Sequence, residues 1–241
     1  MASIVMEGVY YRYRGQAGWA LEDVNLRLPW GRILVTGSTG SGKTTLLRVA
    51  SGAARVYGGE VRGRISLGGR PVLVPQNFDA FILMPTPRME LVYVMENLGL
   101  DPGEIDARLH TISRALGIEG LLDRRIASLS AGERQRVAIA SALATSPDIL
   151  MLDEPLAYVD PQSISRVLDA VTMLGVKAVI VAEHRLHSLR GWPSHLVYME
   201  EGRIRYTGPP RDVEGLPLSI AIQLMDPGDA ARVAEARGCL G

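Results

Sequence analysis

Residues 37–45, GSTGSGKTT, constrain the fold of this chain more than any other stretch. They hold three glycines and one lysine, and they follow the short apolar run ILV. The next segment, KTTLLRVASGA, has apolar residues at helical spacing and reaches Gly52, which is typical of a helix that ends on glycine. A strand, a glycine-rich loop and a helix in this order begin a βαβ unit. The sequence therefore predicts an α/β fold with a mixed, largely parallel sheet.

The loop has the pattern G-x-x-x-x-G-K-[ST] at residues 37–44. In this pattern main-chain N–H groups surround phosphate oxygens, and the positive end of the following helix faces the same anion. Lys43 is predicted to reach the β- and γ-phosphates of a nucleotide, and the hydroxyl of Thr44 to bind Mg²⁺. A chance glycine-rich turn is the alternative, which the flanking strand and helix disfavour. The predicted phosphate-binding residues are Gly37, Ser38, Thr39, Gly40, Ser41, Gly42, Lys43, Thr44 and Thr45.

A second motif, ILMLDE at residues 149–154, places two carboxylates after an apolar run. Phosphoryl transfer requires an acidic residue for the Mg²⁺ shell, normally at the end of a buried strand. We therefore predict that Asp153 helps to hold Mg²⁺ and that Glu154 polarises the attacking water as general base. The alternative is an exposed strand end, which the phosphate loop in the same chain disfavours.

Composition excludes several classes of protein. The chain has 241 residues, 47% hydrophobic and 22% charged, as in soluble globular proteins. Its 26 basic and 26 acidic residues balance, so neither a nucleic-acid tail nor a polybasic membrane anchor is indicated. No apolar run reaches the roughly 18 residues of a membrane span, the first residues do not resemble a signal peptide, and Cys239 is the single cysteine. We expect a cytosolic protein with no nucleic-acid partner.

The first part of the chain predicts strands around the glycine loop. Strands are expected at 3–13 and 24–31, and in the second of these Val24, Leu26 and Leu28 alternate with polar residues. Residues 56–75 carry five glycines and short alternating pieces, which favour small antiparallel strands ending at PVLVPQ.

The rest of the chain predicts a helical block inserted into the α/β core. Helical spacing dominates from about residue 77 to 146, and nearly continuous apolar strands return after Pro147. A closing hairpin is expected around Glu201 and Gly202, and a short helix in the tail at 226–238. The predicted domains are a nucleotide-binding α/β core with an N-terminal β subdomain at 1–76 and 147–207, an inserted helical subdomain at 77–146 and a short C-terminal helical tail at 208–241.

The segment SLSAGERQR precedes one of the predicted helices. Taken alone, it is an ordinary helix start with Ser130 as N-cap. Together with the other motifs it strongly resembles the signature LSGGQ of the ATP-binding-cassette family, which implies that Ser130 and Gly132 approach a γ-phosphate. Two positions depart from that signature: Ala131 replaces glycine, and Glu133 replaces glutamine and is expected to point away from the phosphate.

Further positions match this family in order, over roughly residues 3–207. Gln76, in VPQN, matches the glutamine that senses Mg²⁺ and the attacking water, and His184, in VAEHR, matches the switch histidine at the γ-phosphate. Asp160 matches the aspartate after the acidic pair, although AYVD is atypical before it. The resemblance implies catalytic roles for all three, beside Lys43 and Glu154.

An aromatic residue near the N-terminus of such proteins stacks on adenine. Tyr13 is the best match, because it precedes RG and then ALEDVNLRL. Tyr10 and Tyr11 are rivals, for which packing within a strand is the favoured interpretation.

The resemblance also implies partners and location. Proteins of this family work as head-to-tail dimers, so a second ATPase subunit, identical or related, would complete each ATP site. The EHR at the switch and the tail look most like energy-coupling-factor and cobalt-type importer ATPases. Those proteins move vitamins or metal ions through a transmembrane coupling protein, which implies a cytoplasmic protein bound to the inner face of the membrane. Some apolar residues of the stretch 78–100 are candidates for the docking groove.

Two other functions remain open from the sequence. One is a soluble cassette ATPase of an assembly system, without a transmembrane partner. The other is a regulatory module that does not hydrolyse ATP, which Lys43, Asp153, Glu154 and His184 disfavour.

Overall fold

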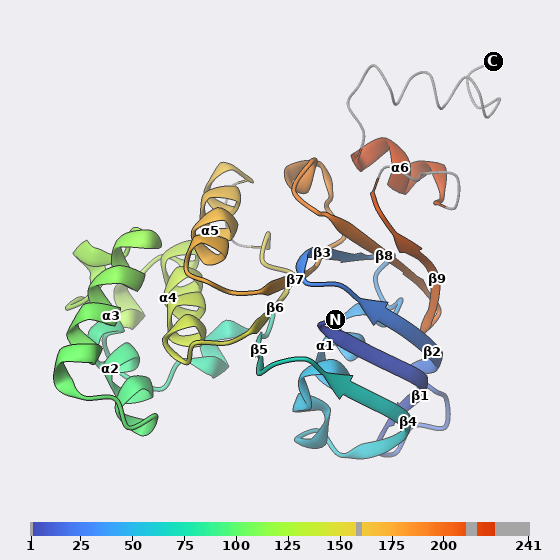
Figure 1. Cartoon of the computed structure of the whole chain (residues 1–241), viewed down its shortest axis with the longest axis horizontal. Coiled ribbons are helices and arrows are strands. Elements are labelled where there is room, and N and C mark those ends of the chain that lie inside the picture. Colours follow the sequence, from blue (N-terminus) through green and yellow to red (C-terminus); the bar gives the residue numbers. More distant parts are fainter. Residues whose placement is uncertain (1, 158–160, 211–215, 225–241) are drawn as a thin grey trace.

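A six-stranded sheet forms the centre of the molecule in the computed structural model, which describes residues 2–157, 161–210 and 216–224 (Figure 1). Five of its strands run parallel and the last pairs antiparallel, as the hairpin around Glu201 and Gly202 predicts. In spatial order the strands are β5 (Pro71–Val74), β6 (Ile149–Asp153), β7 (Ala178–Ala182), β3 (Gly31–Thr36), β8 (His195–Glu200) and β9 (Arg203–Gly208).

A second, antiparallel sheet of three strands lies beside the first (Figure 1). β1 (Ile4–Tyr13) is its middle strand, between β2 (Leu21–Leu28) and β4 (Gly59–Leu67). The alternation predicted for β2 is confirmed, because its apolar positions are buried and the polar ones between them are not. The main chain of Glu22 donates to the carbonyl of Gly202 at 3.0 Å, which joins this sheet to the β8–β9 hairpin.

The prediction of antiparallel strands over residues 56–75 is half wrong. β4 does pair antiparallel with β1, but β5 pairs parallel with β6, from Pro71 opposite Ile149 to Val74 opposite Leu152. The chain changes sheets at Gly68 and Gly69. A Cβ on Gly69 would lie 2.4 Å from the Asp148 side chain, so no larger residue fits there without a shift. PVLV is apolar without alternation, which is the pattern of a strand covered on both faces.

Both faces of the parallel sheet are covered by other elements. Successive strand residues point to opposite faces, so neighbouring residues belong to different apolar clusters. Ile33, Met151 and Ile180 pack with α1 (Lys43–Ser51) and the antiparallel sheet. Leu150 and Val179 pack in a second cluster with residues of the helices that follow residue 86. The nearly continuous apolar strands predicted after Pro147 are therefore β6 and β7, whose residues are buried on both faces of the sheet.

The helical block lies at one end of the molecule, away from the antiparallel sheet (Figure 1). The helical spacing predicted for this block is confirmed, and Ser130 is an N-cap as predicted; Thr86 and Asp101 are two further N-caps, and all three side chains accept main-chain N–H bonds. The block shares one apolar cluster with a face of the parallel sheet, so the division at residues 77 and 146 remains a proposal. The main helices after α1 are α2 (Pro87–Asn97), α3 (Pro102–Ala115), α4 (Ala131–Ala144) and α5 (Pro161–Met173).

Several short helices complete the described part of the chain. Within it, no helix is long and apolar enough to cross a membrane. The tail helix predicted at 226–238 falls outside the described residues, which end with an unpredicted helix, α6. The short helices are η1 (Ala53–Arg55), η2 (Phe78–Phe81), η3 (Glu119–Leu121), η4 (Ile126–Ser128), η5 (His187–Leu189) and α6 (Leu218–Leu224).

A matched pair of leucine substitutions tests where the core lies. Leu150 is fully buried in β6, whereas the Leu83 side chain is 70% exposed. We expect Leu150→Ala to lower the free energy of unfolding by about 2–5 kcal/mol, because it removes buried methyl groups and leaves a cavity. Leu83→Ala should change it by less than about 0.5 kcal/mol. Urea unfolding of both variants measures the difference, and equal effects would contradict this assignment of the core.

Candidate active site

The glycine-rich loop joins β3 to α1 at the carboxyl edge of the parallel sheet. Gly37 has φ 151°, and a Cβ there would lie 2.2 Å from the carbonyl oxygen of Met199, so only glycine fits. Gly42, with φ 103°, is the N-cap of α1. The Ser41 N–H donates to the carbonyl of Ser38 at 3.1 Å, and the Ser41 carbonyl accepts from Gly202 at 3.0 Å. The loop is thus held against the β8–β9 hairpin.

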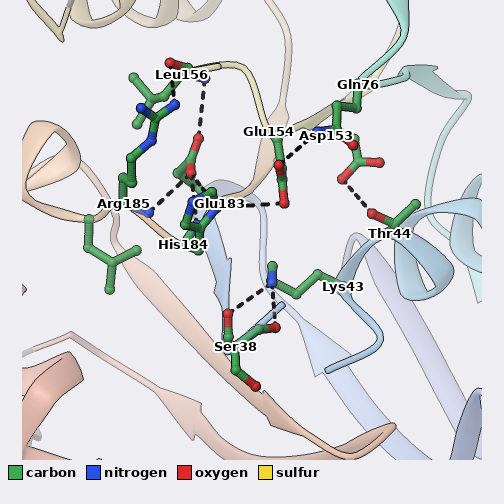
Figure 2. Close-up of polar contacts among 12 residues, drawn as sticks. Ser38, Lys43, Thr44, Gln76, Asp153, Glu154, Leu156, Glu183, His184 and Arg185 are labelled. Carbon is green, nitrogen blue, oxygen red and sulfur yellow. Dashed lines mark hydrogen bonds and ion pairs between the residues drawn. The ribbon is translucent and has the colours of Figure 1, made fainter. Parts of the chain in front are cut away.

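Lys43 closes the loop from within (Figure 2). Its Nζ donates to the carbonyl oxygens of Gly37 and Ser38, each at 2.9 Å. Burial lowers the pKa of Lys43, and the carboxylates of Glu154 and Asp153 oppose that shift. The lysine singled out by the sequence is therefore a buried cation rather than a surface charge.

Thr44 and Asp153 face each other between α1 and the end of β6 (Figure 2). The Thr44 hydroxyl donates to Asp153 Oδ1 at 3.0 Å. Burial raises the pKa of Asp153 to about 6, with a further contribution from the neighbouring Glu154 charge. Burial therefore disfavours the charged form of this carboxylate, which a bound cation would stabilise.

These two side chains fit a magnesium ion. Mg²⁺ prefers oxygen ligands and usually takes one or two carboxylates from the protein, with waters and substrate phosphates completing its octahedron. A hydroxyl beside a buried, undercompensated carboxylate supplies such oxygens. Among the described residues, no group of three or more histidine, cysteine or acidic side chains could hold a metal ion by itself.

Glu154 follows Asp153 and turns out of the sheet. Its φ is 49°, a left-handed conformation that is uncommon for residues other than glycine, and its N–H donates to the carbonyl of Ala182 at 2.9 Å. Gln76 Nε2 donates to Glu154 Oε2 at 3.0 Å (Figure 2). The structure therefore brings together two predicted site residues that lie 78 positions apart.

His184 approaches Glu154 from the end of the neighbouring strand, β7. Its Nδ1 lies 3.6 Å from Glu154 Oε1 and 3.2 Å from Glu183 Oε1. Glu183 is fully buried. It was not among the predicted site residues, although a carboxylate directly after an apolar strand is the same signal that identified Asp153.

A cavity of about 550 Å³ opens over the loop. Eight predicted site residues line it: Thr39, Gly40, Gly42, Lys43, Thr44, Thr45, Gln76 and Glu154. Trp19 also lines this cavity, whereas Tyr13 lines a neighbouring depression with Arg12 and Gly59. The Tyr13 hydroxyl lies 3.1 Å from Thr45 Oγ1. Trp19 was not predicted, because a tyrosine next to RG was the best family match.

The predicted signature lies at the start of α4. Ser130 and Glu133 form a capping box: Ser130 Oγ accepts from the Glu133 N–H, and Glu133 Oε2 accepts from the Ser130 N–H at 2.7 Å. These main-chain and side-chain bonds to Ser130 hold the pKa of Glu133 below its usual value. Of the described residues that line the loop cavity, none comes from α4. Asp160 falls outside the described residues.

The raised pKa of Asp153 predicts a pH-dependent cost in stability. An acid whose pKa is higher in the folded than in the unfolded protein destabilises the fold as the pH rises from the unfolded-state pKa to the folded-state pKa. We expect Asp153→Asn to stabilise the nucleotide-free protein by about 3 kcal/mol at pH 8 and by about half as much at pH 5. Denaturant unfolding at both pH values measures this.

Asp123→Asn is the matched control of opposite sign. Arg88 holds the pKa of the exposed Asp123 below its usual range. Removing the charge of Asp123 should therefore slightly destabilise the protein at both pH values. A loss of stability in Asp153→Asn at pH 8 would show that the folded protein stabilises the charge of Asp153 instead of disfavouring it.

Comparison with known proteins places this site in a family. Residues 21–157 match the family described as ABC transporter. A Treponema denticola protein named putative ABC transporter ATP-binding protein is 34% identical over 218 residues, which are 83% of this chain and 44% of that protein. A Thermotoga maritima protein named energy-coupling factor transporter ATP-binding protein EcfA1 is 33% identical, over 85% of this chain and 81% of that protein. The chain also spans only 37% of a Methanosarcina acetivorans relative.

Solved structures agree on the fold. The structure of cbiO1 from Clostridium perfringens, described as part of the ABC transporter complex cbiONQ, aligns with a TM-score of 0.79 and 25% identity, over 96% of this chain and 98% of that one. An ATP-binding cassette of another ABC transporter shares the fold, with a TM-score of 0.70. More than half of the residues match the family, and the loop, Lys43 and Glu154 line one cavity with Asp153 bonded to Thr44 beside it, so this chain belongs to the ATP-binding domains of ABC transporters.

Proposed function

We propose that this chain binds and hydrolyses ATP with Mg²⁺ and drives a membrane transporter. The main support for this proposal is that Lys43, Thr44 and Glu154 line one loop cavity, with Asp153 bonded to Thr44 and Gln76 bonded to Glu154, each at 3.0 Å. Family membership supports the same chemistry.

Each side chain has a role that its position allows. The loop N–H groups and Lys43 hold the phosphates, while Thr44 and Asp153 supply oxygens to Mg²⁺, which neutralises phosphate charge when bound. Glu154 accepts a proton from the attacking water, which Gln76 helps to orient. His184 contacts the γ-phosphate from the neighbouring strand.

A second subunit completes the site in this proposal. Ser130 is exposed at the start of α4, in a helix N-terminus suited to an anion, and α4 does not line its own loop cavity in the described structure. We propose that Ser130 and Gly132 of one subunit face the phosphate loop of another, identical or related, and that Asp160 acts at the same interface. Closure on ATP and opening after hydrolysis would then move α4 and its neighbours.

The transporter is proposed to be an energy-coupling-factor type importer of a vitamin or metal ion, with the chain on the cytoplasmic face of the membrane. Similarity to the Thermotoga maritima and Clostridium perfringens proteins supports this type. A groove of about 600 Å³ lies beside the segment that follows Gln76, lined by Ile82, Met84 and Ile126 among others. We propose this groove as the docking site of a transmembrane coupling protein.

Replacing the proposed base tests the chemistry. We expect Glu154→Gln to reduce kcat at least about 100-fold while ATP still binds, because the loop is intact and only proton transfer is lost. Glu96→Gln, on the exposed side of α2, is the matched control and should keep the wild-type rate. Phosphate release and binding of a fluorescent ATP analogue measure the two properties. Turnover of Glu154→Gln at the wild-type rate would exclude Glu154 as the base.

The docking groove has its own test. Leu83 lies between two groove residues and its side chain is 70% exposed. The tagged chain, purified from detergent-solubilised membranes of its host, should carry a transmembrane protein, and Leu83→Asp should lose it without losing ATP binding. Leu98→Asp, at the exposed end of α2, is the control. If the wild-type chain carries no membrane protein, the soluble assembly ATPase becomes the better interpretation.

A further inference from the structure

We propose that Glu183 is a positioning residue of the hydrolytic site, which holds the imidazole of His184 and the segment after Glu154 in one arrangement. This inference rests on the proposed ATP hydrolysis. It concerns a residue outside the phosphate loop, the acidic pair and the signature.

Glu183 is a fully buried carboxylate, directly after β7, with an unusually complete set of donors. Its Oε1 accepts from the N–H groups of His184 at 2.8 Å and Arg185 at 3.1 Å, and its Oε2 accepts from the N–H of Leu156 at 3.2 Å (Figure 2). A buried charge is costly unless it is bonded in this way. The carboxylate therefore ties the end of β7 to the segment that leaves β6.

The same carboxylate faces the ring of His184. Nδ1 lies 3.2 Å from Glu183 Oε1, closer than the 3.6 Å to Glu154 Oε1. A carboxylate beside one ring nitrogen fixes both the orientation of an imidazole and which nitrogen carries the proton. In this proposal Glu183 keeps the proton of the neutral ring on Nδ1, which leaves Nε2 free to contact a substrate.

Two further side chains hold the segment after the general base. Arg185 Nη2 donates to the carbonyl of Leu156 at 2.7 Å, and Gln135 Nε2, from α4, donates to the carbonyl of Pro155 at 2.7 Å. With the Leu156 N–H bonded to Glu183, this peptide segment is held from β7 and from the signature helix. That support matters because Glu154 has the left-handed φ of 49°, which persists only where its surroundings enforce it.

The chain offers a matched buried carboxylate that does not line the loop cavity. Glu90 is equally buried, accepts from the N–H groups of Leu83 and Met84 at 2.9 Å each, and accepts from the Ser141 hydroxyl at 2.8 Å. Glu90→Gln therefore measures the general cost of neutralising a buried, main-chain-bonded carboxylate in this protein.

Steady-state ATP hydrolysis by the full chain separates a role in positioning the hydrolytic site from a role in stabilising the fold. We expect Glu183→Gln to lower kcat by about 10- to 100-fold, with KM for MgATP within about two-fold of wild type, because the ring and the base are misplaced while the loop still binds phosphate. Glu90→Gln should lower the melting temperature about as much as Glu183→Gln does, but it should leave kcat within about two-fold of the wild-type value. Equal kcat for Glu183→Gln and wild type would overturn the role of Glu183, whereas a wild-type chain without turnover would overturn the proposed function instead.

Nuclear magnetic resonance of the histidine ring nitrogens gives a readout that needs neither turnover nor a folded variant of Glu183. The signals of His184 are identified by their loss in His184→Ala. In the wild-type protein Nδ1 should carry the proton and Nε2 should be the bare nitrogen or, in the imidazolium, the second N–H. A neutral His184 ring with its proton on Nε2, or one that averages both tautomers, would overturn the proposal.

Discussion

The buried ammonium group of Lys43 is the interaction on which the arrangement of this site depends. It is bonded to two carbonyl oxygens of its own loop, and it lies in the field of three carboxylates, those of Asp153, Glu154 and Glu183. Burial raises the pKa of Asp153, and the neighbouring Glu154 charge adds to that shift, although Arg48 and Lys43 oppose it. Such a site favours the arrival of a divalent cation together with a phosphate chain, because together they bring both the missing positive charge and an anion for the loop N–H groups.

The topology of the sheet explains why these charges meet. β6 and β7 are parallel neighbours with Asp153 opposite Ala182, so the residues that follow, Glu154 and Glu183, leave the sheet at the same edge. β3 lies on the other side of β7 and carries the phosphate loop at that edge. The carboxyl ends of parallel strands are where open α/β sheets bind ligands. Three segments far apart in the sequence therefore meet at one edge of the sheet.

The sequence predicted the parts of this site whose signals are local. The loop pattern, the acids after an apolar strand and the capped helices each depend on a few adjacent residues, and the loop, the acids and Gln76 do converge in the structure. The placement of β5 was missed because PVLV was grouped with the glycine-rich alternating pieces before it, although its own lack of alternation is typical of a parallel strand. Trp19, which lines the loop cavity, was missed because the family match favoured Tyr13.

Buried carboxylates replace sheet hydrogen bonds where the chain is irregular. Glu90 gathers two N–H groups of the segment before α2, and Glu183 gathers three from two segments at the end of the sheet. Because a buried unpaired N–H is costly, each acid satisfies donors that no neighbouring strand can reach, and its charge makes those bonds strong. The consequence is a fixed position for each charge, and at Glu183 this holds the segments that carry His184 and Leu156.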